Sequence, residues 1–286
     1  MNKKQSVLLV GATGYLGSYI LRQLLNQNYS VRVVVRNPQK LPQVDKEHYE
    51  VIEGEVTKPS TLKNCCENVD VVISTVGITR QKDGLTYMDV DYQANLNVLE
   101  EAIKRKVKKF IYVSVLHGDK MKNVKICVAK EKFVERLRHS SLDYTIIRPN
   151  GFFSDLTEFY QMAKRGRVYL FGNGQVKINP IHGEDLAKVC VGAIRKSEIE
   201  IKVGGPEVLT HRSIAFLAFM ALNKKPKITY IPDWVRIASI KFVKTFISSK
   251  TYGPIEFFLT VMARDDMIAP KYGRHTLKTY FENVDL

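Results

Sequence analysis

The first 150 positions of the chain alternate short apolar runs with amphipathic segments, and this pattern predicts the secondary structure. Runs rich in Val, Ile and Leu predict strands, while apolar residues three or four positions apart predict helices. The expected strands cover residues 6–10, 30–35, 49–53, 69–75, 109–114 and 142–148. The main expected helices cover residues 15–28, 87–106 and 128–139. Strict alternation without hairpin signals indicates an α/β fold of the doubly wound type, with helices on both faces of a parallel sheet.

The pattern changes beyond Asn150. It predicts a helix, a turn, a short strand, a helix and a last strand over residues 154–165, 171–174, 177–181, 183–196 and 199–203. From Pro206 onward it predicts helices separated by prolines. We therefore expect a core of residues 1–150, completed by about residues 177–205, and a small, mostly helical lobe. The lobe comprises residues 151–176 and 206–286.

Composition narrows the class of protein. The 286 residues are 45% hydrophobic, and no apolar run approaches the roughly 20 residues that span a bilayer, as expected of a soluble globular protein. Four cysteines without metal-binding spacing and an N-terminus without room for a signal peptide predict a cytoplasmic location. The net charge of +15 is compatible with nucleic acid, an anionic membrane or a solvated basic face. The absence of a nucleic-acid-binding motif disfavours the first.

The chemistry-bearing stretch is SVLLVGATGYLG, in which three glycines follow an apolar strand and open a helix. Gly11 permits a tight turn, Gly14 lets the backbone approach a pyrophosphate, and Gly17 lets the helix pack closely. The helix N-terminus would then present its N–H groups to the phosphates. The predicted dinucleotide contacts in this turn are Gly11, Thr13, Gly14, Tyr15, Leu16 and Gly17.

Arg36 suggests which dinucleotide binds. An acidic residue about 20 positions beyond the glycines would accept a hydrogen bond from the ribose 2′-hydroxyl of NAD. Arg36 stands there instead, at the end of the second expected strand, and a guanidinium can grip a 2′-phosphate. We therefore predict NADP(H) in preference to NAD(H). The alternative is that Arg36 is only a solvated residue at a strand end.

Several separated segments together resemble one family. They are GATGYLG, VRNP, STVG, DYQANLNVLEEA, KKFIYVSVL, DYTIIRPNGFF, NPIHGEDLAKV and VGGPE. The chain thus resembles the atypical short-chain dehydrogenase/reductase superfamily, in particular its NmrA-like branch. Within that branch it is similar to divinyl chlorophyllide reductase-like and photosystem-assembly members. The resemblance covers most of the chain and implies a Rossmann-type fold with a C-terminal substrate lobe.

The resemblance also implies further site residues. Lys130 would hold the nicotinamide ribose, as in the Tyr-x-x-x-Lys pattern of the superfamily, but Ile126 stands where that pattern has its tyrosine. Ser114 lies near the usual serine, and His117 is a candidate general acid, although it can equally be a solvated loop residue. The further cofactor contacts that the resemblance implies are Glu55, Val56, Thr75, Val76, Gly77, Pro149, Asn150, Gly151 and Phe152. No metal site is predicted.

Two functions remain open from sequence. Lys130 and the elaborate C-terminal lobe favour an NADP(H)-dependent reductase acting on a small or lipophilic organic acceptor. The missing tyrosine favours a non-catalytic NADPH-binding sensor, assembly factor or scaffold. The basic amphipathic helix expected from Asp233 to Ser249 can be a lid over the substrate or a peripheral membrane contact. The pattern predicts neither a substrate nor an oligomeric state.

Overall fold

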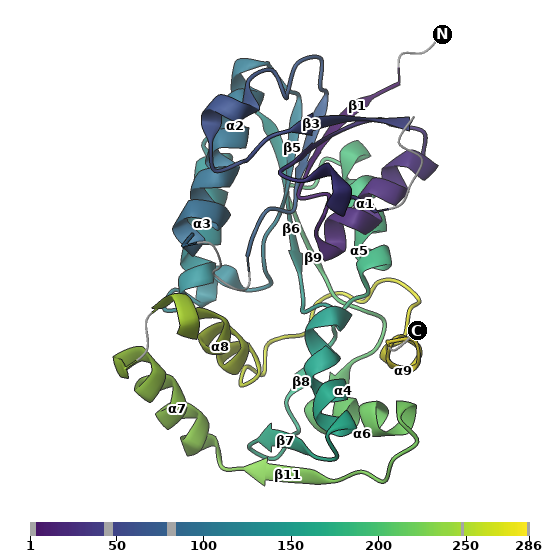
Figure 1. The fold of residues 1–286 in the computed structure, drawn as a ribbon, viewed down its shortest axis with the longest axis vertical. Coiled ribbons are helices and arrows are strands. Elements are labelled where there is room, and N and C mark those ends of the chain that lie inside the picture. The colour runs from purple at the N-terminus through teal and green to yellow at the C-terminus, as the bar shows by residue number, and fades with distance from the viewer. Residues whose placement is uncertain (1–3, 43–47, 79–83, 247–248, 285–286) are drawn as a thin grey trace. The chain divides into compact units, whose positions relative to one another are not determined.

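The computed structural model describes residues 4–42, 48–78, 84–246 and 249–284, and the chain forms two compact units (Figure 1). Unit 1 comprises residues 1–148 and 186–201, and unit 2 comprises residues 149–185 and 202–286. The first boundary thus lies two residues before the expected one. Residues 177–185 and 202–205, which we expected to complete the core, belong to unit 2.

A seven-stranded parallel sheet organises unit 1, in the order β3-β2-β1-β4-β5-β6-β9. Its strands are β1 (Ser6–Val10), β2 (Ser30–Val35), β3 (Tyr49–Glu53), β4 (Val71–Ser74), β5 (Lys109–Val113), β6 (Asp143–Pro149) and β9 (Glu200–Val203). The strand order reverses between β1 and β4, where Val10 pairs with Ser74, and Ser74 in turn pairs with Tyr112 of β5. Ligands of such sheets bind beyond the carboxyl ends of the strands at this switch point.

Helices cover both faces of the sheet. Figure 1 shows α2 (Asn95–Lys104) and α3 (Lys125–Arg138) on one face and α1 (Tyr15–Asn26) and α5 (Gly183–Gly192) on the other. Every residue of β4 and β5 is therefore buried, as in other sheets covered on both faces. The predicted doubly wound parallel sheet is confirmed. Short 3₁₀ helices occupy Pro38–Lys40, Pro59–Leu62, Gly118–Lys120, Phe153–Leu156 and Ala193–Arg195.

Buried Lys109 shows how the sheet accommodates a charged residue. Its Nζ donates a hydrogen bond to the carbonyl oxygen of Ala193 at 2.7 Å and another to that of Lys196. These carbonyls end the helical segment that follows α5, where a cation is favourable. Lys109 therefore fastens this helix end to β5.

The segment before α2 differs from the expected single helix over residues 87–106. Residues Met88–Ala94 form a π-helix, and the regular α2 begins only at Asn95. A π-helix bonds i to i+5 and is found preferentially at functional sites. The polar side chains of Asp91, on the π-helix, and of Asn95, at the start of α2, are completely buried.

Unit 2 is mostly helical, as expected. Three helices pack together, namely α4 (Thr157–Lys164), α6 (His211–Ala221) and α9 (Leu277–Glu282), while α7 (Asp233–Phe246) packs on α8 (Ser249–Val261). Thr210 and Thr276 cap α6 and α9 by accepting hydrogen bonds from backbone N–H groups. The unit core contains the fully buried rings of Phe159, Phe219 and Phe281.

Two small sheets complete unit 2. The sequence pattern did not indicate the parallel pair β7 (Val168–Phe171) and β11 (Ile228–Ile231), which are far apart in the chain. An antiparallel pair joins β8 (Lys177–Ile178) to β10 (Leu209–Thr210). Within the described residues we find no helix that is long and apolar enough to cross a lipid bilayer.

Candidate functional site

The turn between β1 and α1 holds the three glycines, and two of them are required by the fold itself. Gly11 has a φ of +93°, a left-handed conformation that glycine adopts without strain. A Cβ added at Gly17 would overlap the carbonyl oxygen of Gly11, because the first turn of α1 lies directly on the glycine turn. Neither position can carry a side chain without a movement of the backbone.

Gly14 differs because the fold does not demand glycine there. Its φ of −81° and ψ of 168° are open to any residue, and an added Cβ would approach only the carbonyl oxygen of Gly11, at 3.3 Å. It is exposed at the N-cap of α1, whose first turn carries no acidic side chain. An open helix N-terminus of this kind suits an anionic phosphate. Of the other predicted contacts in the turn, Thr13 is exposed, Tyr15 half-buried and Leu16 buried.

Arg36 is exposed at the end of β2, beside a hollow of about 470 Å³. The hollow is lined by Arg36, Asn37, Pro38, Gln39 and Glu53. The Asn37 side chain accepts a hydrogen bond from the backbone N–H of Gln39, which fixes the turn after the strand. Arg36 therefore lines an open hollow, and the lining includes one carboxylate, that of Glu53.

Glu55 and Val56 follow β3, as the resemblance implied, and both are held locally. Lys58 and Thr57 donate to the Glu55 carboxylate, and these contacts hold its pKa below the usual value. The Val56 carbonyl accepts a hydrogen bond from Asn97 of α2 at 2.9 Å. This loop is thus tied to the helix that follows β4.

The loop after β4 is held in place by Asn95. The Ser74 hydroxyl donates to the Asn95 Oδ1 at 2.6 Å, and the Asn95 Nδ2 donates to the Val76 carbonyl at 3.2 Å. Thr75 reaches across to the end of β1, where its backbone N–H donates to the Val10 carbonyl at 3.0 Å. The predicted contacts Thr75, Val76 and Gly77 therefore lie next to the glycine turn.

A buried ion pair lies directly beneath this loop. The Lys130 Nζ of α3 is 3.0 Å from the Asp91 Oδ1 of the π-helix, and Asp91 is fully buried. A Cβ added at Gly77 would lie 2.6 Å from that oxygen and 2.8 Å from the ammonium, so Gly77 must be glycine for the pair to sit there. The other Asp91 oxygen accepts the Ile78 N–H at 3.2 Å. The structure thus brings Lys130 to the switch point together with the β1 and β4 loops.

The phenol of Tyr112, on β5, is buried beside the same ammonium. The Lys130 Nζ lies 5.5 Å from the Tyr112 ring centroid. Burial alone would lower the pKa of Lys130, but the facing Tyr112 and Asp91 more than offset it and raise this pKa, so the side chain is an ammonium at neutral pH. Burial raises the pKa of Tyr112. The phenol is therefore neutral and inaccessible to a substrate.

Sequence reasoning did not identify Asp91, Asn95 or Tyr112 as site residues. All three stand in segments that carried the family resemblance, DYQANLNVLEEA and KKFIYVSVL. A signal was present, because two polar residues four apart in a buried helix need partners. The π-helical turn that directs both side chains inward has no comparable signature in the sequence.

Ser114 belongs to a polar network with Glu131 and Arg148. Its hydroxyl donates to the Glu131 Oε1 at 3.1 Å, and Arg148 grips both oxygens of Glu131 at 2.6 and 2.8 Å. The Arg148 Nε also pairs with Glu200 at 3.1 Å. Ser114 is 6% exposed and Arg148 is 2% exposed. The observed environment of Ser114 is thus an ion-pair network that fastens α3 to β6.

Two positions remain to be placed: Ile126, which stands where the family pattern has its tyrosine, and His117, the candidate general acid. Ile126 is buried in the first turn of α3, one turn before Lys130, so an apolar side chain fills the position expected for a tyrosine. His117 is half-buried, with a left-handed φ of +52°, at the start of the Gly118–Lys120 turn. Its role as a general acid stays a prediction.

Pro149, Asn150, Gly151 and Phe152 begin unit 2. The Asn150 Nδ2 donates to the Asn179 Oδ1 at 2.9 Å and to the Met267 carbonyl at 2.7 Å, and Asn179 in turn binds the backbone of Ala269. The neighbouring Phe153 is core, because it is 1% exposed. These contacts fix the backbone of the segment that the resemblance assigned to the cofactor.

A second polar cluster in unit 2 fastens the C-terminal segment. The Asp185 carboxylate accepts backbone N–H groups of Arg274 and His275, at 3.0 and 3.1 Å, and lies 2.9 Å from the His275 Nδ1. His182, Glu184 and His275 also offer ligand atoms within 4.8 Å of one another. However, the Glu184 N–H donates to the His182 Nδ1, which leaves the proton of the neutral ring on Nε2. The cluster is therefore arranged as a hydrogen-bonded clamp.

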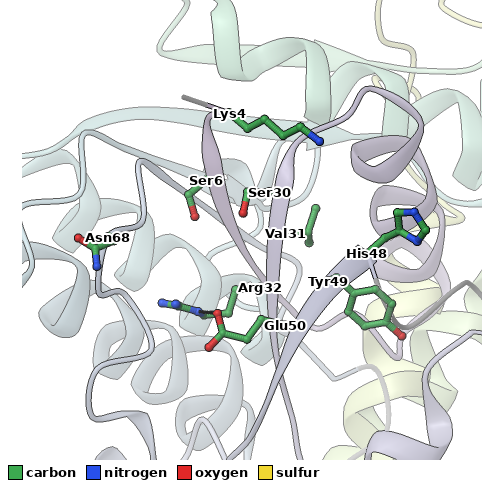
Figure 2. Close-up of a pocket in the computed structure, with 9 residues that line it drawn as sticks. All are labelled: Lys4, Ser6, Ser30, Val31, Arg32, His48, Tyr49, Glu50 and Asn68. Atoms are coloured by element: carbon green, nitrogen blue, oxygen red, sulfur yellow. Dashed lines mark hydrogen bonds and ion pairs between the residues drawn. The ribbon is translucent and has the colours of Figure 1, made fainter. Parts of the chain in front are cut away.

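A larger hollow of about 670 Å³ lies at the amino ends of the first strands, and none of the predicted site residues lines it. Figure 2 shows its lining, with the side chains of Arg32 and Glu50 directed at each other. The Arg32 Nε is 2.7 Å from the Glu50 Oε2, and its Nη1 donates to the carbonyls of Cys65 and Glu67. The charge of Arg32 is therefore paired with Glu50 at the amino ends of the strands. It does not add to the positive charge of Arg36 at the carboxyl end of β2.

Comparison with known proteins identifies the family. Residues 11–197 match the family described as NAD(P)H-binding. The chain is 28% identical to the photosystem II assembly factor Ycf39 of Synechocystis over 84% of its own length and 73% of that protein. It is 27% identical to the chloroplastic divinyl chlorophyllide a 8-vinyl-reductase of Oryza sativa over 98% of its length and 78% of that protein.

Among solved structures, the chain is similar to the NADPH-dependent quinone oxidoreductase QOR2 of Escherichia coli, determined with NADPH. The TM-score is 0.73 at 16% identity, covering 98% of this chain and 100% of that one. At this identity the likeness shows the fold alone. The expected similarity to photosystem-assembly and divinyl chlorophyllide reductase-like proteins is confirmed by the two relatives above.

Proposed function

The chain belongs to the NAD(P)H-binding family, and from this premise we propose that it is an NADP(H)-dependent oxidoreductase. Its substrate would be a small or lipophilic organic acceptor, and the bound cofactor would supply the hydride. The observation that carries the proposal is the Lys130 ammonium, held by Asp91 beneath the Gly77 loop at the switch point. The family pattern assigns this lysine to the nicotinamide ribose, which is why the pair supports cofactor binding.

The chain's own residues fit the cofactor. Gly14 leaves open the space over the N-terminus of α1 that a pyrophosphate would occupy, although the fold alone would tolerate a side chain there. In this proposal the Lys130 ammonium would donate to the ribose hydroxyls. Arg36 lines a hollow at the end of β2 where a 2′-phosphate would lie, which supports NADP(H) over NAD(H).

The cofactor preference is tested with a charge reversal. NADPH should bind more tightly than NADH, and Arg36→Asp should reverse that order. The loss of a charge-assisted contact costs about 1.5–3 kcal/mol, or roughly tenfold to a hundredfold in the dissociation constant. Arg165→Asp, at an exposed position in unit 2, makes the same charge change as a control. Equal dissociation constants of the wild-type protein for the two cofactors would contradict the proposal.

The substrate class follows from proton supply. Reduction of a ketone builds negative charge on oxygen and needs an acid nearby, whereas reduction of an electron-poor alkene lets solvent protonate carbon afterwards. Ile126 occupies the expected tyrosine position, and the nearby Tyr112 is fully buried. We therefore expect turnover among electron-poor alkenes. The relative named as a vinyl reductase supports this choice. Efficient reduction of simple ketones that survives both Lys130→Ala and His117→Ala would place the active site elsewhere.

A second function is favoured by the same missing tyrosine. A protein that binds NADPH without turnover would need the phosphate and ribose contacts but no proton donor, and one relative is named as an assembly factor. Steady consumption of NADPH with any acceptor separates the two proposals. Tight binding without consumption across a panel of ketones, quinones and alkenes would favour the non-catalytic role.

A further inference from the structure

The exposed face of α7 is apolar, which is the reverse of an ordinary surface helix. Trp234, Ile237, Phe242 and Phe246 are 68%, 45%, 60% and 72% exposed. Soluble proteins seldom leave several large apolar side chains together on one surface unless it binds something. Phe242 and Phe246 contact each other, with ring centroids 4.9 Å apart.

Helical spacing places these side chains on one side. At about 100° per residue, the positions from Ile237 round to Phe246 span roughly half of the helix circumference. Ala238, Lys241 and Thr245 are exposed on the same side. The opposite side faces α8, where the Arg236 Nη1 donates to the Leu259 carbonyl at 3.3 Å and Arg236 also pairs with Asp233. Among the described residues of unit 2, no element covers the apolar face.

The exposed charge on this face is basic. Lys241 is exposed on it, and no acidic residue stands between Trp234 and Ile255 in the sequence. Asp233, which precedes this stretch, is engaged by Arg236, and Glu256, which follows, is buried. A helix with Trp and Phe on its apolar face and lysines beside them is typical of proteins that lie on anionic membranes.

We propose that α7 docks this face, formed by Trp234, Ile237, Lys241, Phe242 and Phe246, on the surface of an anionic lipid bilayer. The aromatic rings enter the boundary between headgroups and acyl chains, and Lys241 faces the anionic headgroups. The helix lies in the plane of the surface and does not cross it. This attachment would give the protein access to an acceptor dissolved in lipid, but it does not depend on any turnover.

The chain carries its own probe for this proposal, because Trp234 is its only tryptophan. The full-length protein is titrated with vesicles of phosphatidylcholine alone and with vesicles that also contain phosphatidylglycerol. We expect a blue shift of the Trp234 emission, and co-sedimentation, only with the anionic vesicles. The shift should weaken as salt is added, since headgroup attraction is screened.

Variants that retain Trp234 distinguish the apolar contribution to vesicle binding from the electrostatic one. Phe242→Ser with Phe246→Ser should weaken vesicle binding at least about tenfold, because two rings no longer leave water. Lys241→Glu should weaken it by roughly 30-fold, at about a factor of five for each unit of charge. Ile199→Ser and Lys63→Glu make matched changes at exposed positions of unit 1. Both control proteins should bind as the wild type does.

Other outcomes overturn the proposal. A blue shift on addition of NADP⁺ without vesicles would identify α7 as a lid. A shift that depends on protein concentration, with a matching change in mass on size exclusion, would identify a contact between two copies. Absence of any vesicle-dependent shift, or vesicle binding that survives both α7 variants, would show that this face does not bind lipid.

Discussion

The Lys130–Asp91 pair allows the cofactor role of Lys130 to be separated from its structural role. Three proteins are needed: Lys130→Met, Asp91→Asn and the double variant. Methionine keeps the aliphatic stem of the lysine, and the asparagine oxygen can still accept the Ile78 N–H that Asp91 now binds. The variants therefore change the charges while they keep the shape of the site.

The expected stabilities follow from burial. Asp91 is fully buried and the Lys130 side chain is 13% exposed, so each single variant leaves the other charge without its partner. Removal of one member of a buried pair costs about 3–5 kcal/mol of unfolding free energy. Burial raises the pKa of Asp91, so the cost of Lys130→Met should shrink as the pH falls and this carboxylate takes up a proton. The double variant should recover at least about half of the loss, because neither charge remains.

The NADPH affinities of the three variants should rank differently from their stabilities. Asp91→Asn keeps the ammonium and should change the dissociation constant of NADPH by no more than a few-fold. Lys130→Met and the double variant both lack the donor to the ribose and should bind about tenfold to a hundredfold more weakly. Urea unfolding supplies the stabilities, and fluorescence titration below the unfolding transition supplies the affinities. A double variant that binds NADPH like the wild type would show that Lys130 is only structural.

Three further predictions concern other parts of the chain. Gly14→Val should lower the melting temperature by only a few degrees, because valine is a poorer N-cap and its Cβ meets the Gly11 carbonyl oxygen at 3.3 Å. It should weaken NADPH binding at least about tenfold, because its branched side chain enters the space above the helix N-terminus; retained affinity would place the phosphates elsewhere. Burial lowers the pKa of His211 to about 4 from 6.5, so the unfolded chain binds its proton first as the pH falls. Stability should therefore decline by about 3 kcal/mol between these values, and His211→Asn should abolish that part of the decline in urea unfolding curves. Although burial would raise the pKa of Asp185, the His275 and Arg274 contacts lower it below 3.8, so Asp185→Asn should cost about 1–3 kcal/mol near neutral pH. That difference should diminish as the pH falls below 3.8, and a constant difference would contradict the assignment.

The sequence was sufficient where one physical pattern determines the structure. The apolar runs of β1, β2, β4 and β5 predict strands and not helices, because they are short and rich in β-branched residues. They are mostly apolar because both faces of the sheet are covered. The glycine turn was equally legible, since its spacing reflects steric limits at Gly11 and Gly17. By contrast, β7 and β11 pair over some 60 residues, and neither strand has an alternation that would reveal its partner.

The site could be predicted only in its outline, because its charged interior depends on packing. Lys130 was expected from the family pattern, but nothing in the spacing of Asp91 and Lys130 indicates that they meet. Their contact needs the π-helical turn at Met88–Ala94, which directs Asp91 inward, and the absence of a side chain at Gly77, which leaves room for both groups. Removal of an ammonium from water is costly unless a carboxylate accompanies it. A buried lysine in a family pattern therefore implies a buried acid on a neighbouring element, and here that element is the π-helix, which packs against α3 and supplies Asp91.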